Sequence, residues 1–235
     1  MKWEDLKVYH PLKKEEIKPT FKKFTKIVYD NFEVYGFRQI GRKIYRKSED
    51  LFHIIEIDTR GSWQGMSDSF KTKFEIVSIF DVEIIVNDYT LLGETDIEYF
   101  IPNIRNHYRI NQEYELLAEY LTKKIIEYIL PYFEKYKKSQ NVLLNANEFK
   151  IDRLNERNAN LILFSELNNK IRKNSVSIIE NKIEKYKRLG TLSEIVSENV
   201  DLLNYIKNEN WNEIDSILNE NKLKVYKKLK IKESE

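Results

Sequence analysis

The sequence contains no cysteine, which excludes disulfides, zinc thiolate sites, iron–sulfur clusters and cysteine nucleophiles. Three histidines, at positions 10, 53 and 107, leave little material for a histidine-based metal site. Six glycines and four prolines occur among 235 residues, well below the roughly 12% that these two residues make up in an average protein. Tight turns are therefore scarce, and we expect a chain that is rich in helix.

Long apolar runs are also missing. No stretch approaches the roughly 18 residues that a membrane helix needs. The start Met1-Lys2-Trp3-Glu4-Asp5 has acidic residues where an export signal would be basic and then apolar. We therefore expect a soluble, unexported, cytoplasmic protein. The net charge is only +2, from 40 basic and 38 acidic side chains, which argues against binding nucleic acid or a membrane surface through bulk charge.

The aromatic content is sufficient for a folded core, with 12 Phe, 15 Tyr and 3 Trp. Apolar patterns of both strand and helix occur up to Lys138, and beyond Ser139-Gln140-Asn141 every apolar pattern is helical. We therefore predict an α+β domain over residues 1–138 and an all-helical region over residues 139–235.

Several elements of the first part can be placed. Pro19 suits the first turn of a helix, which then carries apolar residues at helical spacing up to Phe32. Residues 37–47 read as one strand or as two short strands around Gly41, and further strands are expected at 51–58 and 70–80. A long helix from Gln112 should bend or restart at Pro131. The prediction is an antiparallel sheet of about four strands packed against two helices.

Two helix boundaries in residues 139–235 carry clear signals. Gly190 stands where the glycine that ends a helix is expected. Asn210, followed by Glu213, is a candidate N-terminal cap for the last long helix.

The order of features from about residue 20 to 138 resembles the bacterial family known as domain of unknown function 4304. The similar residues are the segments Tyr35-Gly36-Phe37-Arg38, Ile44-Tyr45-Arg46, Leu51-Phe52-His53-Ile54-Ile55, His107-Tyr108-Arg109-Ile110 and Leu130-Pro131-Tyr132-Phe133. That family has no settled activity, and some small bacterial domains of this kind look like immunity proteins that neutralise a partner toxin. The resemblance implies a binding role and supplies no catalytic residues.

An acidic segment is the sharpest compositional feature. Residues 81–100 contain six carboxylates and neither Lys nor Arg. Such a surface could dock a basic protein such as a nuclease toxin, with Asp81, Glu83 and Asp88 as contact residues. The alternative is a solvated loop between strands.

The loop Arg60-Gly61-Ser62-Trp63-Gln64-Gly65-Met66 places a large aromatic residue between two glycines. Trp63 and Met66 are candidate anchors for a protein partner, because Trp is favoured in binding hot spots and Met adapts to varied surfaces. Alternatively, Trp63 folds back over the edge of the sheet.

A basic strand offers a second function. Arg42, Lys43, Arg46 and Lys47 flank Tyr45, a combination that nucleic-acid-binding sheets use for phosphates and bases. On a two-residue period, however, these charges divide between the two faces, which is typical of a solvated edge strand.

Other polar groups are weaker candidates. His53 lies in an apolar strand and is expected to be a satisfied buried or edge residue. His107, Arg105 and Arg109 could bind an anion, and Glu56 with Asp58 could pair with them or hold a divalent metal.

No nucleotide-binding, nucleophile or metalloprotease motif occurs in the sequence. We therefore expect a non-catalytic protein-binding module, such as an immunity protein, with no cofactor. Nucleic-acid binding or processing through residues 42–47 is the alternative.

Overall fold

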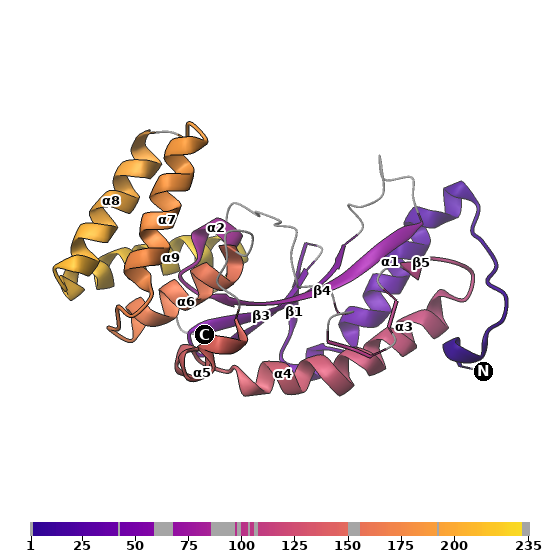
Figure 1. Cartoon of the computed structure of the whole chain (residues 1–235). Helices are drawn as coiled ribbons and strands as arrows, with labels where there is room; N and C mark the ends of the chain where they lie inside the picture. The colour runs from indigo at the N-terminus through magenta and orange to yellow at the C-terminus, as the bar shows by residue number, and fades with distance from the viewer. Residues whose placement is uncertain are drawn as a thin grey trace. The chain divides into compact units, whose positions relative to one another are not determined.

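The computed structural model (Figure 1) describes residues 2–41, 43–58, 68–85, 97, 100–102, 104–105, 108–149, 156–191 and 193–231. The chain forms two compact units. The first consists of Met1–Ser48, Phe52–Ile76 and Gly93–Lys135, and the second of Glu49–Leu51, Val77–Leu92 and Tyr136–Glu235. Each unit thus combines separate stretches of the chain. The predicted domain boundary at residue 138 stays a prediction.

One sheet has the strand order β1-β2-β3-β4-β5, which is also the order of these strands in the sequence. The α+β class predicted from the sequence is confirmed. The sheet has five strands rather than about four, because residues 37–47 form two short strands around Gly41 and a two-residue strand, β5, follows the long β4. The strands are β1 (Arg38–Ile40), β2 (Lys43–Ser48), β3 (Leu51–Asp58), β4 (Ser69–Ser78) and β5 (Tyr108–Arg109).

The central strand β3 is buried along its whole length. Two antiparallel pairs flank this strand. Arg38 of β1 lies opposite Tyr45 of β2, and Phe70 of β4 lies opposite Tyr108 of β5. A central strand covered on both faces needs apolar residues at consecutive positions, and Ile54-Ile55 provides them.

The first unit contains two helices that pack against each other, α1 (Lys14–Asp30) and α3 (Tyr114–Lys124). Phe24 of α1 lies against Phe70 of β4, with ring centroids 4.9 Å apart. Burial of these two rings attaches α1 to the sheet.

Helix α1 begins at Lys14, so the prediction that Pro19 lies in its first turn is wrong. The Glu16 carboxylate accepts a hydrogen bond of 2.8 Å from the Lys13 amide, and this bond fixes an earlier start. Pro19 therefore lies inside the helix, where it has no amide to donate to the Glu15 carbonyl.

The break expected at Pro131 takes the form of a π-helical turn, Ile125–Ile129, between α3 and α4 (Leu130–Lys135). The Leu130 amide donates to the Ile125 carbonyl, five residues back. Pro131 has no amide hydrogen to donate, and the π turn accommodates this gap in the hydrogen bonding of the helix.

The second unit is helical outside its short strand ends, as predicted for residues 139–235. No helix within the described part of the chain is both long and apolar enough to cross a membrane. Neighbours in sequence pack together from α5 to α9, and α2 packs against α9. The helices of this unit are α2 (Val82–Ile85), α5 (Ser139–Leu144), α6 (Glu156–Asn168), α7 (Ser175–Arg188), α8 (Ser193–Lys207) and α9 (Trp211–Leu229), with a short 3-10 turn at Ala146–Glu148. The first unit has 3-10 turns at Trp3–Asp5 and Glu33–Tyr35.

Both helix boundaries expected in this region lie where the sequence placed them. Gly190 has a φ of 65°, and the Thr191 amide donates to the Tyr186 carbonyl at 3.0 Å, which closes α7 in a Schellman motif. Asn210 precedes the first residue of α9, but its side chain makes no capping hydrogen bond.

Candidate functional site

The acidic segment predicted to contact a partner begins at the short helix α2. Asp81 and Glu83 are described, whereas Asp88 lies outside the described residues, as do Trp63 and Met66. Asp81 is 1% exposed, and its Oδ1 accepts a hydrogen bond of 3.0 Å from the Ile84 amide. Its buried carboxylate therefore caps the N-terminus of α2.

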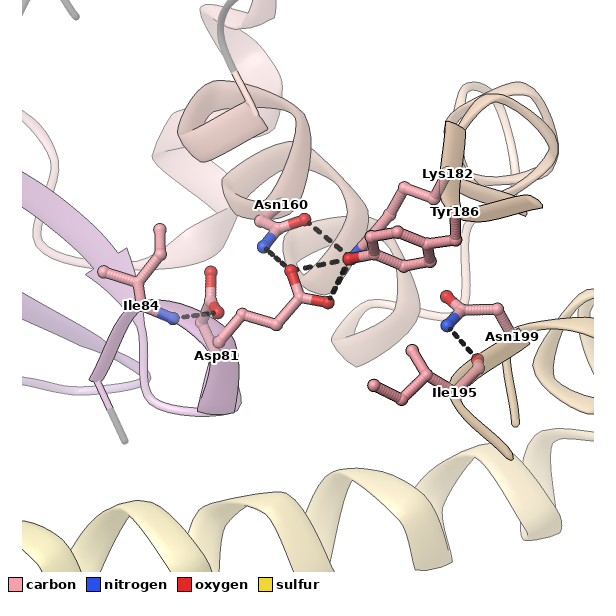
Figure 2. Close-up of polar contacts among 8 residues, drawn as sticks. Asp81, Ile84, Asn160, Lys182, Tyr186, Ile195 and Asn199 are labelled. Atoms are coloured by element: carbon pink, nitrogen blue, oxygen red, sulfur yellow. Dashed lines mark hydrogen bonds and ion pairs between the residues drawn. The ribbon is translucent and has the colours of Figure 1, made fainter. Parts of the chain in front are cut away.

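Glu83 is the centre of a polar cluster, which we call the Glu83 cluster: Asp81, Glu83, Asn160, Lys182 and Tyr186. Lys182 Nζ lies 2.9 Å from both oxygens of Glu83. Asn160 Nδ2 and the Tyr186 hydroxyl each donate to the same carboxylate at 2.9 Å. Figure 2 shows Asn160, Lys182 and Tyr186 converging on this group.

The donors come from two helices far from Glu83 in the sequence. Asn160 belongs to α6, and Lys182 and Tyr186 lie one turn apart on the same face of α7. Lys182 also donates to Asn160 Oδ1 at 3.2 Å. Its three donor positions are therefore all used, because an ammonium has three N–H groups.

The two acids of the cluster have pKa values that shift in opposite directions. Burial, followed by the charge of Glu83, raises the pKa of Asp81 to about 6. Burial also acts to raise the pKa of Glu83, but Lys182, Asn160 and Tyr186 together hold it below its usual range. Glu83 is therefore held as a carboxylate, whereas the carboxyl of Asp81 has a pKa of about 6.

Such divergent acids can mark a reactive site, but the bonding here is that of an anchor. Glu83 has donors on both oxygens. Asp81 is closed off from solvent, and its Oδ2 has no hydrogen-bond partner within the described part of the chain. The cluster connects α2 to α6 and α7. A role of Asp81 and Glu83 in contacting a partner stays a prediction.

Asn160, Lys182 and Tyr186 are not among the site residues predicted from the sequence. The spacing of Lys182 and Tyr186 by four residues shows only that they share a helical face. The packing of α6 against α7 directs that face toward α2. The sequence pattern contains no signal for this packing.

A comparison of the chain with protein-family models, with curated proteins and with solved structures finds no match. The resemblance to domain of unknown function 4304 therefore stays a prediction from the residues quoted for it.

The basic strand predicted at residues 42–47 is β2, and it is not at an edge. It lies between β1 and β3, since β1 continues the sheet beyond it. Arg42 lies outside the described residues. Lys43 is 8% exposed, and its Nζ lies 3.8 Å from Oε2 of Glu56.

Arg46 is also engaged within the first unit. Its guanidinium donates to His53 Nδ1, at 2.9 Å from Nη2, and lies 2.9 Å from the Glu134 carboxylate. It also stacks over the ring of Phe37, at 5.1 Å from the centroid. Lys47 is half-buried. The internal partners of Lys43 and Arg46 weigh against phosphate binding through this strand.

His53 fulfils the prediction of a satisfied buried histidine. It is fully buried, and its ring stacks on Phe133 with centroids 4.5 Å apart and planes 3° from parallel. Because Nδ1 accepts from Arg46, the neutral ring carries its proton on Nε2.

The carboxylates considered as a metal site have lysine partners instead. Asp58 Oδ2 lies 2.7 Å from Lys73 Nζ, and both side chains are buried. Among the described residues, no group of three or more His, Asp or Glu side chains could hold a metal ion. Arg109 pairs with Asp68 at 2.8 Å, and His107 lies outside the described residues.

Proposed function

We propose that this chain is a non-catalytic protein-binding module whose partner is a basic protein. The observation that carries the proposal is helix α8, which has unpaired acidic side chains on one face and partly exposed apolar ones on another. Such a mixture is typical of surfaces that attract a partner by charge and then bury apolar area against it.

The acidic side chains of α8 are Glu194, Glu198 and Asp201, spaced by four and three residues and all exposed. This spacing puts them on one face of the helix. Lys207, the only base in α8, is already paired with Glu180 at 2.7 Å. None of the three acids has an ion pair within the described part of the chain, so their charge is available to a basic partner.

The apolar side chains of α8 are only partly covered. Of its aliphatic residues only Ile206 is buried. Val196, Val200 and Leu203 follow one another at helical spacing and remain half-buried. These side chains still have apolar area to bury against a partner.

The proposed surface differs from the one predicted from sequence. The carboxylate of Asp81 is buried, and that of Glu83 is bonded within the second unit. Helix α8 presents the same charge at exposed positions. Neutralisation of a toxin is the finer form of the proposal, because a toxin that acts on nucleic acid needs a basic surface that an acidic helix can occupy.

The test begins with the full-length tagged chain, used to capture its partner from host lysate at low salt. Binding of the purified partner is then measured for Glu194→Lys/Glu198→Lys. The matched control is Glu115→Lys/Glu119→Lys, which changes two exposed acids at the same spacing on α3. We expect a basic partner that is released by salt.

The α8 variant should associate at least about tenfold more slowly, because charge at an interface acts mainly on the rate of encounter. The control should bind as the unmodified chain does. Recovery of no protein, or equal binding by both variants, would contradict the proposal.

A further inference from the structure

Helix α1 has a face made of lysine. Its buried side carries Thr20, Phe24 and Val28. From residue 18 to 26, the exposed positions are Pro19 and four lysines, and Lys14 is exposed one turn earlier. We call Lys14, Lys18, Lys22, Lys23 and Lys26 the lysine face.

Carboxylates occur only at the two ends of this face. Asp30 pairs with Lys26 at 2.6 Å, and Glu15 and Glu16 are exposed in the first turn. Lys14, Lys18, Lys22 and Lys23 have no ion pair within the part of the chain that the structure describes. At least four positive charges are therefore free to meet a ligand.

Helix stability does not explain the arrangement. Lysines four residues apart repel each other, and Lys14, Lys18, Lys22 and Lys26 form an unbroken series of this kind. Lys14 also lies at the positive end of the helix dipole, where acidic residues are preferred. By contrast, Lys227 and Lys228 lie in the last turn of α9, where the dipole favours cations.

Composition does not explain the arrangement either. The chain has almost as many acidic as basic side chains, yet the middle of this face has none. A helix that segregates charge of one sign at a cost in stability fits a polyanion.

We propose that the lysine face of α1 binds the phosphate backbone of a double-stranded nucleic acid. Four residues of helix rise about 6 Å, so Lys14 to Lys26 extend over about 18 Å. A duplex carries one negative charge per roughly 1.7 Å of its axis, so each lysine finds phosphates within reach.

The other exposed residues of α1 favour a double-stranded nucleic acid over a single strand or a membrane surface. Single-strand binders stack bases on exposed aromatic rings, and the exposed positions from 18 to 26 carry only lysine and proline. Membrane-surface helices insert an apolar face, whereas Phe24 and Val28 are fully buried in the protein. The proposal is independent of protein binding by α8.

The test measures binding of the full chain to fluorescent 20-base-pair DNA and RNA duplexes between 50 and 200 mM NaCl. For about four phosphate contacts, the logarithm of the affinity should fall with the logarithm of salt at a slope of about −4, roughly a hundredfold over this range. For Lys18→Glu/Lys22→Glu, we expect a slope shallower by about 2 and at least about tenfold weaker binding at 50 mM.

Two control variants separate the face from net charge. Lys123→Glu/Lys173→Glu makes the same change in charge at exposed positions outside α1 and should bind as the unmodified chain does. Lys18→Arg/Lys22→Arg keeps the charge and should also bind normally. Thermal unfolding of each variant should stay near that of the unmodified chain, because every substituted side chain is exposed.

Three results would overturn the proposal. One is the absence of duplex binding by the unmodified chain at 50 mM salt. Another is an equal loss of binding in Lys123→Glu/Lys173→Glu, which would assign binding to bulk charge. The third is retention on phosphatidylserine vesicles without duplex binding, which would assign the face to a membrane surface.

Discussion

The cores of the two units differ in composition. The core of the first is a set of contacting aromatic rings, in which Phe133 meets His53, Phe37 and Phe74 at centroid distances of 4.5 to 6.0 Å. The second buries mainly aliphatic side chains and adds carboxylates that each accept several hydrogen bonds.

Three carboxylates in the second unit show this most clearly. Glu83 binds Asn160, Lys182 and Tyr186. Glu166 accepts hydrogen bonds from the amides of Asn174 and Ser175 and thereby caps α7. Asp50 accepts from the Ser139 amide at 2.9 Å and from Asn168 Nδ2 at 2.6 Å.

The comparison shows how each kind of core fails. An aromatic core loses stability in proportion to the volume that is removed, and its contacts do not depend on ionisation. A carboxylate that binds several buried donors fails abruptly, since its removal leaves each donor unsatisfied. Stability should therefore depend on ring volume in the first unit and on individual hydrogen bonds and pH in the second.

The largest expected effect is that of Phe133→Ala. Phe133 is fully buried among three rings, so the cavity should lower the free energy of unfolding by about 4 kcal/mol. Urea unfolding measures the loss, and hydrogen exchange should locate it in the first unit. Val34→Ala, at a side chain 83% exposed, should change stability by less than about 0.5 kcal/mol. A small loss for Phe133→Ala would refute the aromatic core.

Next in size is Glu166→Ala in the second unit. Glu166 is 1% exposed, and its loss leaves the first amides of α7 without an acceptor, so we expect about 3 kcal/mol of destabilisation. Hydrogen exchange should increase first in α7. Glu180→Ala, which removes an exposed carboxylate from α7, should lower the free energy of unfolding by less than about 1 kcal/mol. Equal losses for the two variants would show that the cap adds nothing.

A pH-dependent effect is expected for Asp81→Asn. Since burial and Glu83 raise the pKa of Asp81 from 3.8 to about 6, the folded protein keeps a proton between these values that the unfolded chain releases. The contribution of Asp81 to the free energy of unfolding therefore falls as pH rises from about 4 to 6. Asparagine carries no charge and keeps an oxygen for the Ile84 amide.

The substitution should raise the free energy of unfolding by about 1–2 kcal/mol at pH 7.5 and change it little at pH 4. Urea titrations at the two pH values measure this difference. Asp201→Asn, at an exposed position of α8, should show no such dependence on pH. The same change in stability at both pH values would contradict a buried, titrating Asp81.

The smallest expected effect is that of Tyr186→Phe. It removes one of the donors to Glu83 while keeping the ring, so we expect about 1 kcal/mol of destabilisation. Thermal unfolding measures this loss of stability. The matched control is Tyr128→Phe, at a half-buried position of the first unit. If both tyrosine substitutions have equal effects, the Tyr186 hydroxyl does not contribute to the anchor.

The fold was more accessible from sequence than the site. The bounds of β3, the glycine that ends α7 and the break before Pro131 follow from local signals, since each depends on residues close together in the chain. The start of α1 was placed too late because the bond from Lys13 to Glu16 outweighs the usual preference of proline for a first turn.

The sequence by itself determined the α+β class, the helical character of the C-terminal part and the segregation of charge on individual helices, because these are properties of neighbouring residues. Only the tertiary structure decided which charges are available to a partner. It placed Asp81 and Glu83 inside a helical cluster, and Lys43 and Arg46 beside internal partners, while leaving the acids of α8 and the lysines of α1 exposed. The reason is that burial and pairing depend on residues a hundred positions apart, whose approach no local pattern records.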